Sequence, residues 1–573
     1  MNLMTRAGLL WRVLKWRMTW NRRQLDYRPS GIANPKFMSA LEAVRRIPDG
    51  AVVLSSGMAA NARASVWFWA VAESFRRTGH PKGLTHITVG AQGGRGRVPG
   101  TVEELGALDG CLKRFIGGHL ETMKSILRKA DAGKIELHTM PQGMEALLVD
   151  AQRQGTFEIT SETGVGTFLD PRVGAGSVVT PPTAESLISV SGNGLRYSLP
   201  PIDAAYFIAP AADADGNIYM RDCCMHTEAY ESALAARANR GVVLVSVARI
   251  VAPGWSEIFL RADQVDAIAV HPLNEQTGAV PQLHHWEMFT EGAEVDMADA
   301  MEKLRFINRV LGITPKRFAV DNALARLAAS TFTATVDRCA NVVIGVGLPE
   351  EVARLIFEGG LFADVTFISE TGVKGGLPAP GIFFGAGINP REILSSAQVF
   401  KLCYDHLDVA ILGMLEVDSE GNVNVSRRGE AAIDYVGPGG FPDFCAAAKT
   451  LIFVGAWMNG ARMSVADGKL KFLKRGPHKF VKKVREITMC GSEALRRGKA
   501  VYYVTHVGVF RLTARGMMLE QIMPGIDLQR DILDACPMRV ILPAAGVVPT
   551  VAADIVTGKA FTLAWDARAH GLS

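Results

Sequence analysis

The sequence predicts an α/β protein made of two homologous domains, each built on a mostly parallel sheet. Short apolar runs such as "AVVLSSG" (51–57) and "LTHITVG" (84–90) alternate with helical stretches such as "ARASVWFWAVAESFRR" (62–77). Glycines follow several expected strand ends, which is where open parallel sheets bind ligands. Two landmarks recur in the second half at nearly the same spacing, and this recurrence predicts a duplicated domain.

The two landmarks define the expected domains. "SETG" at 161 recurs at 369, and "DADGN" at 213 recurs as "DSEGN" at 418. Glu162 and Gly216 are 54 residues apart, and Glu370 and Gly421 are 51 apart. We therefore expect an N-terminal domain over 49–282 and a C-terminal domain over 336–573. The helix-rich stretch 283–335 between them is predicted to be a structured connector.

Residues 1–48 are predicted to form a basic N-terminal extension. Trp11, Leu14, Met18 and the basic residues between them fit an amphipathic helix that covers an apolar patch of this protein or of a partner subunit. Contact with a membrane surface is the alternative. Arg and Lys interrupt the segment too often for a signal-peptide core or a membrane span, so no transmembrane segment is expected.

The composition limits the function classes. The 573 residues, 48% of them hydrophobic, suffice for two to four domains. A formal net charge of +5 is too small to predict nucleic acid as a partner. The eight cysteines indicate reduced, mostly buried thiols and a cytoplasmic location. Cys223 and Cys224, with His226 nearby, lack further ligands for a tetrahedral site, so no metal is expected.

Glu370 is the candidate catalytic residue, because it stands where an apolar strand runs out into the glycine-rich segment "SETGVKGGLPAPG". A carboxylate at the end of a buried strand is costly unless it is neutralised, hydrogen-bonded or used in chemistry. The alternative is that it caps the following turn. Gly372, Gly375 and Gly376 lack side chains, and we expect them to let a substrate approach the carboxylate.

Two further glycine loops offer candidate oxyanion donors. Gly345 and Gly347 of "GVGLP" follow another expected strand, and Gly439 and Gly440 lie in "YVGPGGFPDF". Backbone amides in such loops can stabilise an oxyanion. Asn424 is a candidate side-chain donor, and equally a turn residue that bonds its own backbone.

These motifs resemble the class I coenzyme A transferases, in the fused single-chain form similar to propionate and short-chain acyl-CoA transferases. The resemblance covers about residues 48 to 560. Its motifs, in the order typical of the family, are "RFIGGH" (114), "MPQG" (140), "TGVGTFLDPR" (163), "GVGLPEEVA" (345), "SETGVKGGLPAPG" (369), "DVAILGMLEVDSEGNVNVSR" (408), "GGFPDF" (439), "GKLKFLKRGPHKFVKKVREIT" (468), "YYVTHVGVFRLT" and "PGIDLQRDIL".

The resemblance implies an open α/β/α fold with the active site at the domain interface, and a nucleophilic glutamate at Glu370. Thr371 replaces the usual Asn or Ser, and Glu162 would be a non-catalytic copy. Glu370 would form an acyl-glutamyl anhydride and then a glutamyl-CoA thioester, so that CoA passes between carboxylic acids by a ping-pong mechanism. Short-chain fatty acid metabolism is the expected setting. No cofactor is implied, since CoA is itself a substrate.

The resemblance also implies acyl-CoA and carboxylic acid substrates and a homodimer or homotetramer. The glycine loops with Asn424 would contact CoA as well as the oxyanion. The Lys-rich run 469–483 is either a contact for the CoA phosphates or a solvated strand and turn. Met144, Phe383 and Phe384 either line the acyl pocket or belong to the core.

Three other functions are weighed. A nicotinamide enzyme is discounted, because "GAQGGRG" lacks the ordered dinucleotide-binding glycines. An acyl-CoA hydrolase on the same fold stays open, since water would need only to intercept the covalent intermediate. A non-catalytic acyl-CoA-binding protein is the second open alternative.

Overall fold

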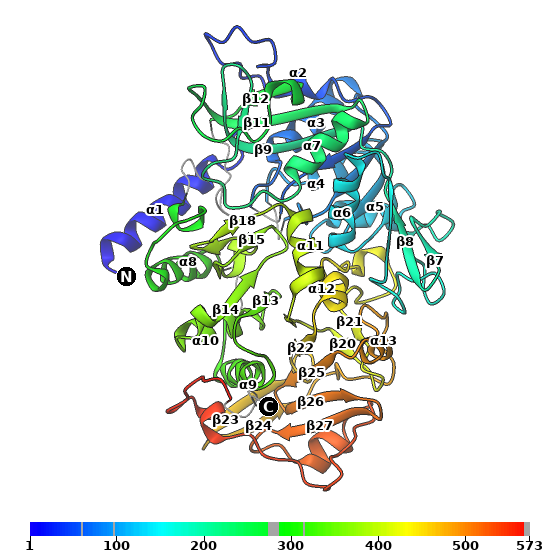
Figure 1. Cartoon of the computed structure of the whole chain (residues 1–573), viewed down its shortest axis with the longest axis vertical. Helices are drawn as coiled ribbons and strands as arrows, with labels where there is room; N and C mark the ends of the chain where they lie inside the picture. The colour runs from blue at the N-terminus through cyan, green and yellow to red at the C-terminus, as the bar shows by residue number, and fades with distance from the viewer. Residues whose placement is uncertain (59–60, 95–97, 273–285, 313–315, 567–573) are drawn as a thin grey trace.

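The computed structural model describes residues 1–573 apart from 59–60, 95–97, 273–285, 313–315 and 567–573. Two mostly parallel sheets, one in each half of the chain, form its core (Figure 1). The α/β fold class predicted from the sequence is confirmed. The predicted join at 282–283 lies outside the described residues, and the other domain boundaries stay predictions.

The first sheet has the strand order β12-β11-β9-β1-β2-β3-β4-β6, with β10 paired to β9. All pairs from β12 to β4 are parallel, whereas β6 and β10 are antiparallel to their neighbours. Its strands are β1 (Val52–Ser55), β2 (Leu84–Thr88), β3 (Leu112–Gly117), β4 (Glu136–His138), β6 (Val178–Thr180), β9 (Ala204–Asp213), β10 (Ile218–Tyr219), β11 (Val242–Val251) and β12 (Ala267–Val270).

The second sheet has the order β18-β15-β14-β13-β19-β22-β25-β26-β27. The pairs from β14 to β25 are parallel, and both edges are antiparallel. Its strands are β13 (Ala340–Ile344), β14 (Val365–Ile368), β15 (Val373–Lys374), β18 (Glu392–Ile393), β19 (Val409–Leu412), β22 (Thr450–Val454), β25 (Ala500–Thr505), β26 (Gly508–Thr513) and β27 (Gly516–Ile522).

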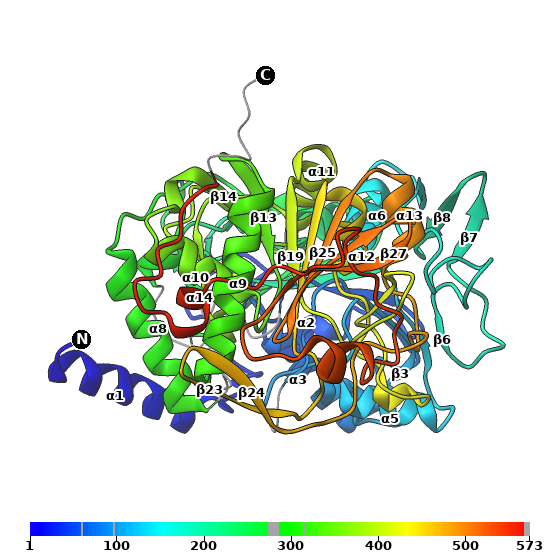
Figure 2. The same cartoon turned by 90° about the horizontal axis from the view of Figure 1, so that it is seen from below.

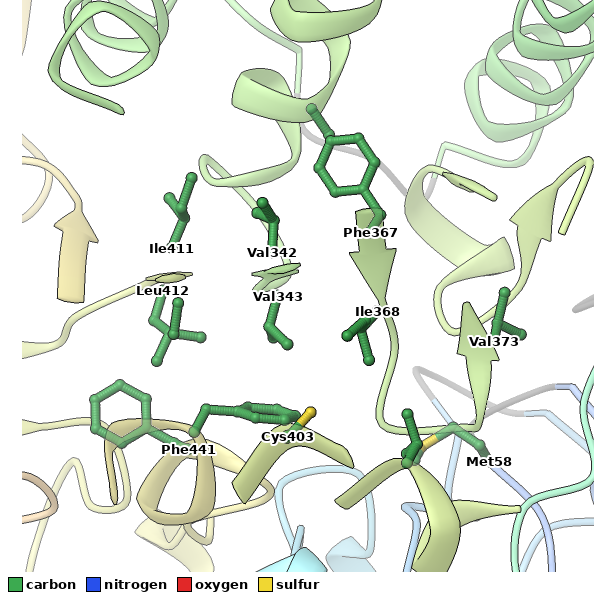
Figure 3. Packing of buried hydrophobic residues seen from close by; sticks show 14 of the residues in the cluster. Met58, Val342, Val343, Phe367, Ile368, Val373, Cys403, Ile411, Leu412 and Phe441 are labelled. Atoms are coloured by element: carbon green, nitrogen blue, oxygen red, sulfur yellow. The ribbon is translucent and has the colours of Figure 1, made fainter. Parts of the chain in front are cut away.

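Helices cover both faces of each sheet, because successive side chains of a buried parallel strand point to opposite faces and both faces are apolar. In the second half, Val342, Ile411 and Phe367 point to one face, and Val343 and Leu412 to the other (Figure 3). The helices on the first sheet are α2 (Ala40–Val44), α3 (Ser65–Thr78), α4 (Glu103–Gly106) and α5 (Lys124–Asp131) on one face, and α6 (Gln142–Gln152) and α7 (Ala229–Ala238) on the other. Those on the second are α9 (Ala319–Thr335) and α10 (Glu350–Glu358) on one face, and α11 (Ser396–His406) and α12 (Phe441–Ala447) on the other.

The strand order carries the duplication that the sequence predicts. The order β12-β11-β9-β1-β2 in the first half matches β25-β22-β19-β13-β14 in the second. The turns after β9 and β19 also agree in detail. Asp213 accepts hydrogen bonds from the amide and the side chain of Asn217, and Asp418 accepts the same two from Asn422.

The other landmark is not a topological counterpart, which corrects the sequence analysis. Glu162 follows β5 (Glu158–Ser161), which pairs with β8 (Gly194–Ser198) in a separate antiparallel sheet completed by β7 (Ile188–Ser191). Glu370 follows β14, whose partner in the first half is β2. The four-residue identity around Glu162 and Glu370 is therefore a coincidence, whereas the turns after β9 and β19 mark the true duplication.

The halves meet through helices. Helix α6 of the first half packs on α11 and α12 of the second, and these helices lie between the two sheets in Figure 1. The predicted connector contains α8 (Met297–Leu311) and α9, and α9 packs on β22 and β25. Smaller elements complete the second half: β16 (Leu377–Pro378) with β17 (Gly387–Ile388), β20 (Glu416–Val417) with β21 (Val423–Asn424), β23 (Arg462–Ala466) with β24 (Lys469–Lys474), α13 (Gly491–Arg496) and α14 (Ala553–Thr557).

The N-terminal extension begins with the predicted helix, α1 (Leu3–Thr19), which packs on α8. Figure 2 shows it projecting at one end of the molecule. Its buried side is formed by Leu9 and Trp16. The three residues that we expected to cover an apolar patch, Trp11, Leu14 and Met18, are exposed. None of the helices in the described ranges is both long and apolar enough to cross a membrane.

Candidate active site

A cavity of about 1650 Å³ lies between the two halves of the chain. Its wall includes Met58 and Gln142 from the first half, Arg309 from α8, and Gly345 and Glu370 from the second half. Segments that are far apart in the sequence thus line the same cavity. The location agrees with the general rule that open α/β sheets bind ligands outside the carboxyl ends of their strands.

Glu370 lies at the tip of the tight turn that joins β14 to β15. The Gly372 amide donates to the Ser369 carbonyl at 3.0 Å, and the Ser369 amide donates to the Val373 carbonyl at 2.9 Å. Thr371 holds this turn in place, because its buried hydroxyl donates to the Gly385 carbonyl at 2.5 Å. The local fold therefore projects the Glu370 side chain from the strand end into the cavity.

The Glu370 carboxylate has apolar surroundings. A Cβ atom added to Gly440 would lie 3.0 Å from Oε2 of Glu370, and the rings of Phe400 and Phe444 stack beside this position. Within the described part of the chain, no donor is hydrogen-bonded to either Glu370 oxygen. Burial, with a smaller contribution from the negative charge of Asp443, raises the pKa of Glu370 from 4.5 to about 7.

Asp443 is a buried acid on α12 that joins the two halves. Its Oδ2 accepts from the Gly143 amide at 2.8 Å, and its Oδ1 accepts from the Tyr404 hydroxyl at 2.8 Å. Tyr404 in turn contacts the Thr163 hydroxyl at 2.8 Å. Burial raises the pKa of Asp443 to about 7 despite these hydrogen bonds. Two acids with raised pKa values therefore lie close to one another at this interface.

Backbone hydrogen bonds tie three of the quoted motifs together beside Glu370. The Gly439 amide donates to the Gly118 carbonyl at 2.7 Å, and the Gln142 amide donates to the Gly439 carbonyl at 3.0 Å. The Leu120 amide donates to the Val436 carbonyl at 2.8 Å. The motifs "RFIGGH", "MPQG" and "GGFPDF" are therefore the contact between the halves on which the cavity depends.

Gln142 is a candidate functional residue that the sequence analysis missed. It lines the cavity at the first turn of α6, and its Nε2 is buried without a hydrogen-bond acceptor in the described structure. An unpaired buried amide is costly, so an amide left free beside a cavity indicates a role in binding. The signal in the sequence was a polar residue between proline and glycine, four positions after the end of β4, in the quoted "MPQG".

The predicted oxyanion amides are mostly engaged elsewhere. Gly345 and Gly347 line the cavity, yet the Gly345 amide donates to the Ile411 carbonyl and the Gly347 amide to the Glu350 carboxylate. The Gly439 amide is used between the halves, as described above. The Gly440 amide has no acceptor among the described residues, and it alone of these four stays available as a donor.

Asn424 is a turn residue in this structure. It is fully buried, its Nδ2 donates to Glu416 and to the Arg427 carbonyl, and its Oδ1 accepts from the Ser426 and Arg427 amides. It is not part of the cavity wall. The local alternative weighed in the sequence analysis is therefore the one that the geometry favours.

Gly372, Gly375 and Gly376 do not line the cavity, which corrects their expected role in substrate approach. A Cβ at Gly372 would lie 1.8 Å from the Leu394 carbonyl oxygen, where φ is also +102°. A Cβ at Gly375 would lie 2.2 Å from Nε of Arg391, and one at Gly376 3.0 Å from the Ile388 carbonyl oxygen. These glycines allow the segment 387–394 to pack closely on the Glu370 turn.

The remaining candidates divide between surface, core and cavity. Glu162 is exposed and lies 3.3 Å from Arg497. Met144 and Phe383 are buried in the core, whereas Phe384 lines the cavity. The Lys-rich run forms β24 and the turn after it and contributes nothing to the cavity wall, and Cys223 and Cys224 are buried thiols.

Comparisons with known proteins agree on the family. No protein-family model matches the chain. The caffeate CoA-transferase of Acetobacterium woodii is 30% identical over 549 residues, which cover 93% of this chain and 98% of that one. The acetate CoA-transferase YdiF of Escherichia coli K12 is 30% identical over 513 residues, 87% of this chain and 91% of that one.

The fold agrees as well. A crystal structure of the acyl-CoA transferase YdiF from Escherichia coli O157:H7, as a thioester complex with CoA, superposes with a TM-score of 0.78 at 28% identity. The match covers 91% of this chain and 95% of that one. The chain therefore belongs to the family of single-chain CoA-transferases.

Proposed function

We propose that this CoA-transferase moves CoA from an acyl-CoA donor to a carboxylic acid by a ping-pong reaction on Glu370. The observation that carries the proposal is a carboxylate that faces a large cavity without a hydrogen bond or ion pair among the described residues. A weakly solvated carboxylate with a raised pKa is a better nucleophile than one held by donors.

The reaction balances without water, metal or an external electron donor. Glu370 attacks the thioester carbonyl, which breaks the C–S bond and leaves an acyl-glutamyl anhydride and CoA thiolate. The thiolate attacks the glutamyl carbonyl, releases the first carboxylate and leaves a glutamyl-CoA thioester. An incoming carboxylate then repeats the two steps in reverse. The thioester bond is conserved, so the transfer needs no ATP.

Each step passes through a tetrahedral oxyanion, and two groups are placed to stabilise it. The Nε2 of Gln142, which has no acceptor among the described residues, lines the same cavity as Glu370. Gly440, whose amide also has no acceptor there, lies beside the Glu370 carboxylate. Donors that are aimed in advance at the developing charge contribute most to such catalysis. We propose Gln142 and Gly440 as the donors, in place of Gly345, Gly347, Gly439 and Asn424.

The wall formed by α8 and the segment before α9 suits the anionic end of CoA. Arg309 and Lys316 line the cavity, and neither has an ion-pair partner in the described part of the chain. CoA carries several phosphate charges, which basic side chains attract. The thioester complex of the similar YdiF with CoA supports the same substrate here.

Initial rates test the proposal. Transfer from propionyl-CoA to acetate is measured over a range of propionyl-CoA concentrations at several fixed concentrations of acetate. A ping-pong enzyme gives parallel double-reciprocal lines, because the first acid leaves before the second acid binds. Intersecting lines would refute the covalent route. Release of free CoA without an acceptor would identify a hydrolase instead.

The pH profile follows from the raised pKa values. Only ionised Glu370 attacks, so we expect kcat/KM to fall below about pH 7 and to reach a plateau above it. Asp443→Asn removes a negative charge that raises the Glu370 pKa, so the inflection moves to lower pH. The asparagine fits if Tyr404 donates to Thr163 instead. Rates measured between pH 5 and 9 test this, and an inflection near 4.5 in the native protein contradicts it.

A further inference from the structure

Arg63 is a buried arginine on the cavity wall, and the described part of the chain holds no acidic partner for it. Its side chain is only 6% exposed, although it lines the cavity. Its Nε donates to the Ser65 hydroxyl at 3.1 Å and its Nη2 to the Pro99 carbonyl at 3.3 Å. Nη1 has no acceptor, and no carboxylate forms an ion pair with the group, among the described residues. Glu275 is the sole acid outside those residues.

Burying a guanidinium without a counter-charge is unfavourable, because its two neutral acceptors replace hydrogen bonds to water but do not balance its positive charge. Burial lowers the pKa of Arg63 to about 10, which still leaves it charged at neutral pH. Two other arginines of the wall, by contrast, are paired with carboxylates. Arg354 pairs with Glu351 at 2.7 Å, and Arg428 pairs with Glu121 at 2.5 Å. Arg63 therefore has a charge available for a ligand.

The loop that carries Arg63 lies against the Glu370 turn. The Asn61 side chain donates to the Phe384 carbonyl at 2.8 Å. A Cβ on Gly385 would lie 3.6 Å from Met58 and 2.7 Å from the methyl group of Thr371. Figure 3 shows Met58 near the end of β14, beside Ile368. Arg63 thus lines the cavity from the loop that faces the nucleophile.

We propose that Arg63 binds a second, distal carboxylate of the acid that exchanges CoA, so that dicarboxylic acids are preferred substrates. The proposal rests on the transferase function proposed above. A distal carboxylate would supply the missing negative charge and accept from Nη1. The phosphates of CoA suit this position less well, because the pantetheine arm separates them from the thioester that must reach Glu370.

Matched acceptors test the preference. Transfer from acetyl-CoA to succinate or glutarate is compared with transfer to monomethyl succinate, butyrate and valerate. Monomethyl succinate keeps the chain but removes the distal charge. We expect kcat/KM to be about 10- to 100-fold higher for the dicarboxylates, as for a charge-assisted hydrogen bond in a buried site. Equal or lower values for the dicarboxylates overturn the proposal.

Variants of Arg63 test whether this residue causes the preference for dicarboxylic acids. Arg63→Met should make the kcat/KM values for succinate and monomethyl succinate equal. Arg63→Lys should retain part of the preference for succinate. Arg428→Met is the control, because it removes a cavity-lining charge that is already paired. This variant should keep the native preference for succinate over monomethyl succinate. A raised KM for acetyl-CoA with an unchanged acid ratio would place CoA, not the acid, at Arg63 and refute the inference.

The outcomes separate this inference from the proposed function. Should Arg63→Met fail to fold, the acid ratio of the native protein and the Arg63→Lys variant still decide the question. If no acid accepts CoA from any donor, the transferase proposal fails. If monocarboxylates accept CoA as well as dicarboxylates, the inference about Arg63 fails alone.

Discussion

Replacing Glu370 with alanine is expected to lower the rate of CoA transfer by at least about 10⁴-fold, because the covalent route loses its nucleophile. The same change should abolish the CoA-sized mass increase that the native protein shows after mixing with an acyl-CoA. A transfer assay measures the loss of rate, and intact-protein mass measurement detects the loss of the CoA adduct. Stability should change little, since no described residue is hydrogen-bonded to the carboxylate.

Glu162→Ala is the matched control for this experiment. Glu162 stands in the same Ser-Glu-Thr-Gly sequence, but it is exposed and paired only at the surface, where ion pairs contribute about 0–1 kcal/mol. The variant should keep full activity and the mass increase. Glu370→Gln, which preserves the size of the side chain, should behave as the alanine variant does. If the Glu370→Ala variant formed the CoA adduct as fast as the native protein does, the proposed mechanism would be wrong.

Gln142→Ala is expected to lower kcat by about 10²- to 10³-fold, as for the loss of an oxyanion donor, with a smaller effect on KM. The Nε2 atom has no acceptor in the described structure, so the alanine variant loses no internal hydrogen bond from it. Steady-state kinetics with a saturating donor measure kcat, and thermal unfolding measures stability.

Gln152 provides the control on the same helix. Its Nε2 donates to the Leu199 and Pro200 carbonyls, so Gln152→Ala leaves buried acceptors unpaired. We expect that change to cost about 1–3 kcal/mol of stability and to leave kcat unchanged for the folded enzyme. If Gln142→Ala behaves like Gln152→Ala, the side chain is structural and the oxyanion donor lies elsewhere.

Much of this architecture could be predicted from local patterns. The apolar runs at 51–57 and 84–90 became β1 and β2. The turns that begin at Asp213 and Asp418 form the same hydrogen bonds from Asn217 and Asn422 in the two halves. Such features depend on residues close in sequence, whose periodicity and turn chemistry are visible without coordinates. The identical tetrapeptides around Glu162 and Glu370 suggested equivalent positions in the two halves. This was wrong, because four residues do not determine which strand of a sheet they follow.

The sequence by itself determined the α/β fold, its duplication, the membership of the transferase family and the position of Glu370 at a strand end. Only the tertiary structure decided which donors are free. The amides of Gly345 and Gly439 look like that of Gly440 in the sequence, but long-range acceptors use the first two. Likewise, Gln142 and Arg63 became candidates because both are buried, and neither Nε2 of Gln142 nor the charge of Arg63 finds a partner among the described residues. Whether a polar group is satisfied depends on distant partners, and that information is absent from local sequence.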